Sequence, residues 1–170
     1  MNIRLKDITN APSDIPHHTT IIHKRPDYIS WQCVNIPKHI NALEAYIKLT
    51  ANQPKWLSVL FLIRDAMAKL VGIKAVLGFK ELKGGKEKLH FFDVIENEDN
   101  KLTLKIEDIH LDVCLCIVIV DNNLSNDFNR LFLTTSVKNK NILGKIYMIP
   151  VSVLHPIIAK KLLSNIVRKG

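Results

Sequence analysis

The sequence is poor in the residues that mark several whole classes of protein. Of 170 residues, only 6 are glycine and 7 are proline, which excludes collagen-like and low-complexity chains. A share of 47% hydrophobic residues excludes a wholly disordered chain. No uninterrupted apolar run is long enough to cross a membrane, and the opening residues lack the apolar stretch of a secretion signal. One cytoplasmic domain of ordinary size is therefore expected.

Cysteine is also scarce, which bears on redox and metal chemistry. The three cysteines are Cys33, Cys114 and Cys116. An odd, small number without a secretion signal indicates a reducing compartment, and no disulfide is expected. The histidines at positions 17, 18 and 23 have no cysteine or carboxylate partners at metal-ligand spacing, so exposed loop histidines are favoured over a metal site. No cofactor is predicted, since the chain has no GxGxxG motif.

Acidic residues are absent after Asp127, although basic residues continue to the end of the chain. The net charge of +8 therefore lies entirely in the C-terminal quarter, which includes Lys138, Lys140 and Lys145. One interpretation is a surface for nucleic acid or an anionic membrane. The other is a set of solvated lysines on ordinary elements, and the rarity of arginine and aromatic residues in this quarter favours it.

Hydropathy patterns divide the chain into a lead-in, residues 1–26, and a single domain, residues 27–170. A short strand over 31–36 precedes a helix in which Ile40, Leu43 and Ile47 form one apolar row. A second helix is predicted over 55–71, with a broad apolar face and Gly72 at its end. An amphipathic helix over 156–168 closes the chain.

Between these helices the hydropathy pattern has a period of two, which is typical of strands. Six strands are predicted, near 75–82, 88–96, 101–108, 110–121, 130–139 and 145–153. Short turns between them imply an antiparallel meander. The run 111–120 is apolar on both faces, so its second face needs cover from the N-terminal segment or from a second subunit, which would make a homodimer.

This element order resembles the helix-grip fold of the START and birch-pollen-allergen superfamily. The resemblance implies an α+β domain in which a curved antiparallel sheet of about seven strands surrounds a long C-terminal helix, with two helices after the first strand. Such a fold has a cavity between the sheet and the C-terminal helix.

An ordered set of short motifs over residues 27–168 resembles a bacterial family called "domain of unknown function 2867". The motifs are Asp27-Tyr28, Trp56, Arg64-Asp65, the stretch 70–74, the stretch 108–112, the stretch 144–147 and Leu154-His155. Two positions depart from the family pattern: Lys145 stands where arginine is usual, and Val153-Leu154 where Pro-Phe is usual. Some members carry a fused NAD-binding domain, which this chain lacks. The family has no established biochemical role, so the resemblance bears on fold rather than on activity.

Asp108, His110 and Asp112 form the most suggestive polar cluster. If the strand is regular from Asp108, these three side chains share one face with Cys114 and Cys116. A histidine beside carboxylates can act as a general base, and with the cysteines it could bind a soft metal. The alternatives are contacts to a polar ligand, or hydrogen bonds that close a strand end, and the last is favoured.

Three more residues are candidates for ligand contact. Arg64 lies near the apolar face of its predicted helix. There it either forms a buried ion pair with Asp108 or Asp112 or binds a ligand anion, and the ion pair is the favoured alternative. Tyr147 and His155 either point polar tips into a cavity or act as a packed aromatic and a helix cap.

Three hypotheses of function follow, in order of preference. The first is a module that binds a small hydrophobic or amphipathic molecule, which rests on the resemblance in fold, with Arg64, His110, Asp112 and Tyr147 at its polar end. The second is an enzyme in the same cavity, with His110 as base and Asp112 as the acid that orients it. The third is a basic C-terminal surface that binds nucleic acid or an anionic membrane.

Overall fold

The computed structural model describes residues 15–51, 88–89, 92–122 and 127–167. Their order is β1 (Tyr28–Pro37), α1 (Ala42–Ala51), β2 (Lys88–Leu89), β3 (Phe92–Glu98), β4 (Lys101–Glu107), β5 (Leu111–Val120), β6 (Phe128–Asn139) and α3 (Ile142–Val167). The predicted helix over 55–71 and the predicted strand over 75–82 lie outside the described residues.

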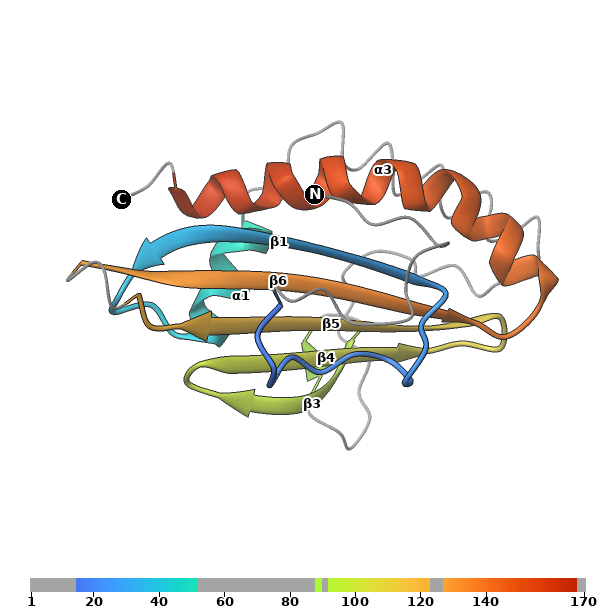
Figure 1. The fold of residues 1–170 in the computed structure, drawn as a ribbon, viewed down its shortest axis with the longest axis horizontal. Helices are drawn as coiled ribbons and strands as arrows, with labels where there is room; N and C mark the ends of the chain where they lie inside the picture. The colour runs from blue at the N-terminus through green and yellow to red at the C-terminus, as the bar shows by residue number, and fades with distance from the viewer. Residues whose placement is uncertain (1–14, 52–87, 90–91, 123–126, 168–170) are drawn as a thin grey trace.

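The strands form one curved antiparallel sheet in the order β1-β6-β5-β4-β3-β2 (Figure 1). Strands β3 to β6 follow one another as the predicted meander, which confirms an α+β fold of antiparallel type. The first strand pairs with the last, Tyr28 opposite Val137 and Pro37 opposite Phe128. The described sheet has six strands rather than about seven.

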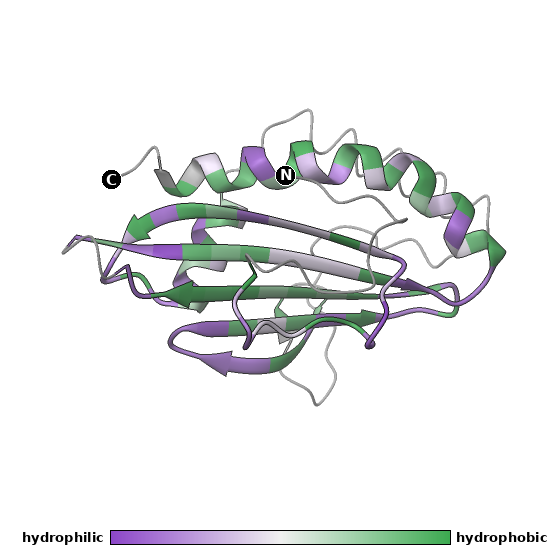
Figure 2. Cartoon of the chain, in the orientation of Figure 1, coloured by the Kyte–Doolittle hydropathy of each residue, from purple (hydrophilic) through white to green (hydrophobic). Residues whose placement is uncertain are grey.

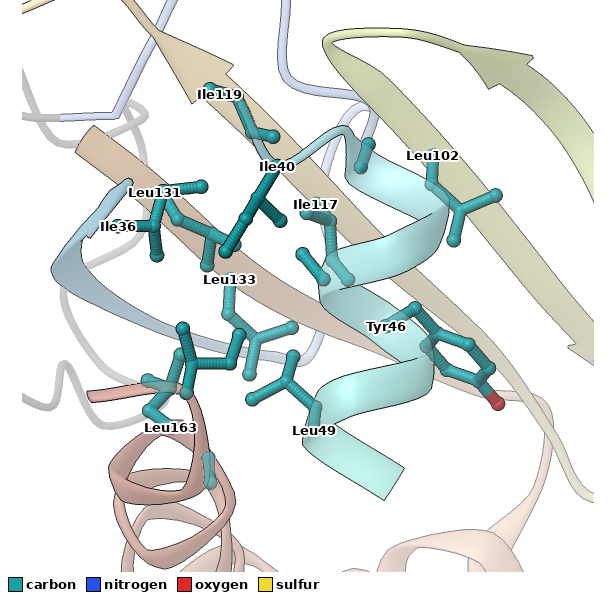
Figure 3. Close-up of a cluster of buried hydrophobic side chains, with 14 of the residues drawn as sticks. Ile36, Ile40, Tyr46, Leu49, Leu102, Ile117, Ile119, Leu131, Leu133 and Leu163 are labelled. Carbon is teal, nitrogen blue, oxygen red and sulfur yellow. The ribbon is translucent and has the colours of Figure 1, made fainter. Parts of the chain in front are cut away.

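One face of the sheet is apolar and is covered by the two helices. On this helix face lie Leu102 of β4, Ile117 of β5 and Leu133 of β6, which are packed against Leu49 of α1 and Leu163 of α3 (Figure 3). All five side chains are almost fully buried. Because side chains alternate along a strand, the register then fixes which residues of every strand face the helices and which face the opposite, outer side.

Helix α1 begins at an asparagine cap, because Asn41 Oδ1 accepts the N–H of Glu44 at 2.8 Å. The prediction of a helix here is confirmed, but the predicted apolar row is right only for Ile40 and Leu43, which pack in the core. Ile47 is 52% exposed, whereas the buried side consists of Ala42, Ala45, Tyr46 and Leu49. The small alanines allow the helix to lie close to the sheet, and that contact decides which side is buried.

The prediction of a strand over 145–153 is wrong, because this stretch is the first part of α3. Asn141 begins the helix by accepting the N–H of Gly144 on its side-chain oxygen at 3.1 Å. The helix continues through Pro150 and Pro156, each of which lacks the N–H that bonds four residues back. It bends toward its N-terminal end, as Figure 1 shows, and prolines are a usual cause of such bends.

By length and composition, α3 could cross a membrane over Ile142–Ser164, where the mean hydropathy is 1.6. The sequence predicts no such segment, because it contains no uninterrupted apolar run of about 18 residues. Only 22% of this window is buried in the protein. One side of α3 nevertheless packs on the sheet and on α1 through Ala159, Leu163 and Ile166, as in a domain helix.

The N-terminal segment, residues 15–27, lies across the outer face of the sheet (Figure 1). The Thr20 N–H points to Cys116 Sγ at 3.4 Å, and the Ile22 N–H donates to Ser136 Oγ at 2.8 Å. At the end of the segment, Asp27 accepts the N–H of Asn139 at 2.8 Å. The N-terminal segment thus covers the second apolar face of β5, for which a second subunit was the other candidate. A homodimer stays a prediction.

Candidate functional site

Asp108 and His110 lie in the turn between β4 and β5, not on a strand. Strand β5 begins at Leu111, so the predicted alignment of Asp108 and His110 with Asp112 is not formed. Asp108 Oδ1 accepts the N–H of His110 at 3.0 Å, and the Asp108 N–H donates to the Leu111 carbonyl at 3.0 Å. The Asp108 carboxylate therefore closes the turn, which is a common task of aspartate.

His110 is buried where this turn meets the start of α3. Its Nδ1 lies 3.1 Å from Oδ1 and 2.9 Å from Nδ2 of Asn141, the residue that also caps α3. Its carbonyl accepts the N–H of Lys140 at 2.8 Å. Its Nε2 is buried and has no hydrogen-bond partner among the described residues. Asn141, rather than a carboxylate, thus orients this imidazole.

Asp112 belongs to the outer face of β5, away from the helices. Its side chain is buried, with Oδ1 2.6 Å from Lys140 Nζ and Oδ2 3.5 Å from His23 Nε2. Lys140 Nζ also donates to the Asp108 carbonyl at 2.7 Å. His110 and Asp112 therefore have different partners, and no contact among the described residues favours a general-base pair.

Cys114 and Cys116 follow Asp112 on the outer face, where the N-terminal segment covers them. The Cys114 thiol lies 3.7 Å from the Thr20 carbonyl. Burial raises the pKa of Cys114 to about 12, and burial also raises the pKa of Cys116. Both thiols thus stay protonated at neutral pH, and thiolate is the form that binds metals. Among the described residues, no group of three His, Cys, Asp or Glu side chains is placed to hold a metal ion.

Tyr147 and His155, both of α3, lie on the helix side of the sheet. Tyr147 is half-buried and packs against a cluster formed by Tyr28, Leu111, Val137 and Met148. The His155 ring meets the Tyr28 ring edge-on, with the ring centroids 6.0 Å apart. Burial lowers the pKa of His155 to about 4, so this imidazole is neutral at neutral pH. Arg64 lies outside the described residues.

Tyr28, Ser30, Thr135 and His155 form a polar belt between the sheet and α3. Ser30 and Thr135 are register partners on neighbouring strands, and both are buried. Helix α3 contacts β1 on both sides of Ser30, through His155 at Tyr28 and through the Pro156 carbonyl, which accepts a 2.8 Å bond from Gln32. Ser30 and Thr135 therefore face the middle of the helix.

The polar belt separates two apolar clusters on the helix face. On one side is the cluster of Leu111, Val137 and Met148, which the ring of Tyr28 joins to the belt, and on the other is the larger core around Leu133 and Leu163. Thr135 Oγ1 and His155 Nδ1 are buried without a hydrogen-bond partner among the described residues. Burial raises the pKa of the Tyr28 hydroxyl, and an interaction with the Ser30 side chain offsets part of that rise.

The sequence pattern indicates only part of this belt. His155 is among the predicted ligand contacts, whereas Ser30 and Thr135 are not. The sequence does mark Thr135 as unusual. The positions of β6 that face the helices are Leu131, Leu133, Thr135 and Val137, so one polar residue interrupts an apolar series.

Comparisons with known proteins give a family but no characterised relative. A search of curated proteins and a search of solved structures each found no match. The family described as "Protein of unknown function (DUF2867)" matches residues 22–162, which is most of the chain. That span includes the whole polar belt as well as the turn that holds Asp108 and His110. The chain therefore belongs to the family of proteins of unknown function DUF2867.

Proposed function

We propose that this domain, in a helix-grip type of arrangement, binds a small amphipathic molecule between the helix face of the sheet and α3. The observation that carries the proposal is the polar belt, in which buried polar atoms without partners lie between two apolar clusters. A ligand with one polar group and an apolar body matches that division.

The energetics of the polar belt support a ligand. A buried polar group without a hydrogen bond costs about 1–3 kcal/mol, and Thr135 Oγ1 and His155 Nδ1 are two such groups. A hydroxyl or carboxyl group of a ligand could bond to both. The apolar part of the ligand would lie against the neighbouring leucine and valine side chains, where burial contributes about 25 cal/mol per Å².

The proposal changes which of the predicted residues contact the ligand. Tyr147 and His155 stay as ligand contacts, joined by Tyr28, Ser30 and Thr135. Asp108, His110 and Asp112 are replaced, because the first two lie in the turn between β4 and β5 and the third faces the outer side. Arg64 stays a proposed partner for a ligand anion.

Two neighbouring threonines give a matched test. Thr134 and Thr135 are both buried, and Oγ1 of each lacks a partner among the described residues, but they face opposite sides of the sheet. Binding of the fluorescent fatty acid cis-parinaric acid should weaken about tenfold in Thr135→Val, because one hydrogen bond is lost. Binding should stay within about twofold of wild type in Thr134→Val.

Two results would refute the proposal. One is the absence of saturable fluorescence enhancement with the wild-type protein. The other is an equal loss of affinity in Thr135→Val and Thr134→Val, because this would show that the probe does not meet the helix face of the sheet.

A further inference from the structure

The outward side of α3 has a row of exposed apolar side chains. Ile142, Ile146, Ile149, Val153 and Ile157 follow one another at steps of four and three residues, which puts them on one side of a helix. Their exposed fractions are 65, 48, 68, 50 and 59% in that order. We call these five residues the isoleucine row. Isolated exposed apolar residues are normal, but a row of five along one helix is not.

The isoleucine row is separate from the packed side of the same helix. Met148, Ala159, Leu163 and Ile166 are the α3 residues that are buried in the two apolar clusters, and none belongs to the row. Figure 2 shows that the hydrophobic colour recurs along the whole length of α3. The helix is thus apolar on two sides, and the domain uses only one of them.

The charges along α3 all have the same sign. The helix has no aspartate or glutamate, and its charged residues are Lys145, Lys160 and Lys161. Lys145 and Lys161 flank the isoleucine row, and Lys160 continues its line by one turn. Lys145 and Lys160 are exposed, and Lys161 is partly exposed. Lysine stems can lie along an apolar surface while their charges reach anionic groups.

We infer that the isoleucine row and its lysines bind an anionic lipid surface, with α3 lying in the plane of the membrane. Exposed apolar residues with flanking lysines are the pattern of interfacial helices, in which apolar burial and attraction to anionic headgroups act together. The helix lies on the membrane rather than crossing it, because its other side is packed on the sheet.

Charge also argues against two other partners for the isoleucine row, a second copy of the chain and nucleic acid. In a symmetric dimer through this row, two copies of a helix that carries only positive charges come together, and no acid of α3 compensates the repulsion of their lysines. Nucleic acid would set phosphates against five apolar side chains, and α3, residues 142–167, has neither an arginine nor an exposed aromatic ring to bind it.

Co-sedimentation with lipid vesicles tests the inference. The full chain should bind vesicles that contain phosphatidylcholine and phosphatidylglycerol, and should bind at least about tenfold less to phosphatidylcholine alone. Ile149→Glu combined with Val153→Glu should lower binding at least about tenfold. Ile95→Glu is the control, because Ile95 is 53% exposed on β3, at the far side of the sheet from α3 (Figure 1).

A charge variant separates the electrostatic part of binding. Lys160→Gln with Lys161→Gln should weaken binding to the anionic vesicles about tenfold while leaving the apolar row intact. The inference is overturned if Ile95→Glu weakens binding as much as the double variant in the row. It is also overturned if light scattering shows a dimer that the row variant dissociates, or if duplex DNA binds and the vesicles do not.

Discussion

Gly144 stands where the first turn of α3 meets the turn between β4 and β5. A side-chain carbon at this position would lie 2.2 Å from the carbonyl oxygen of His110. That oxygen belongs to the backbone and already accepts the N–H of Lys140, so it cannot move aside without breaking the turn. Only glycine therefore allows the helix to begin this close to His110.

Gly144→Ala should lower the free energy of unfolding by about 2–3 kcal/mol, because the added methyl group overpacks the contact with His110. Urea unfolding followed by circular dichroism measures the change. Lys145→Ala is the matched control, since Lys145 is the exposed neighbour and its substitution should change stability by no more than about 0.5 kcal/mol. Equal stability of Gly144→Ala and wild type would contradict the close approach.

His155 should make the stability of the protein depend on pH. Its pKa is about 4 when folded and about 6.5 when unfolded, so the unfolded chain binds the proton more tightly. The free energy of unfolding is therefore at its full value above about pH 6.5. It falls by about 2–3 kcal/mol in total as the pH decreases toward 4. His155→Phe should remove this part of the pH dependence, and His39→Gln, at an exposed site, should not. Unfolding midpoints measured at several pH values for the wild type and both variants test this prediction. A pH dependence of stability that is unchanged in His155→Phe would show that burial of His155 is not its cause.

The sequence identifies the polar residues at this end of the sheet but not what they contact. The prediction of a shared face for Asp108, His110 and Asp112 assumes that the strand is regular from Asp108. An aspartate side chain can instead close a turn on a backbone N–H, and Asp108 does so. The partners of Asp112, Lys140 and His23, come from segments 28 and 89 residues away. No local pattern reveals such contacts.

At the scale of elements, α3 shows where hydropathy patterns are ambiguous. The stretch 145–153 combines β-branched residues with a proline, which is typical of an edge strand as much as of a helix. The stretch folds as a helix because Asn141 caps the first turn and because the inner side of the helix can pack on the sheet. The meander of β3 to β6 was predictable, since polar turns separate its strands and the pairing is local.

The N-terminal segment should control the reactivity of the buried thiols. Cys114 and Cys116 lie beneath it, whereas Cys33 on β1 is partly exposed. With Ellman's reagent, native protein should react rapidly at one thiol and slowly at two. Ile22→Asp places a charge at a side chain that is only 6% exposed, so it should detach the N-terminal segment from the sheet. The reaction of Cys114 and Cys116 should then be at least about tenfold faster.

The exposed neighbour Lys24 provides the control for this experiment, and Lys24→Asp should leave the slow thiols slow. Rapid reaction of all three thiols in the native wild-type protein would show that the segment does not cover the outer face. Far-ultraviolet circular dichroism of Ile22→Asp would establish that the sheet itself stays folded.

The whole molecule has two faces of different kinds. The outer face is covered by the chain's own N-terminal segment, while the helix face has the polar belt between its apolar clusters. The sequence indicates the α+β class and the C-terminal helix, and the resemblance of its motifs gives the family. The belt depends on the register of β1 with β6, which pairs residues about 105 positions apart, and on the contact of α3 with β1. The sequence determines such distant pairings, but no local pattern in it reveals them.

Native mass spectrometry of the freshly purified chain, before and after incubation with cis-parinaric acid, tests whether a ligand binds between the sheet and α3. We expect an added mass that is lost on denaturation, that survives in Thr134→Val and that is reduced in Thr135→Val. The bare mass of the protein in every sample, with and without the fatty acid, would contradict a ligand site between the sheet and α3.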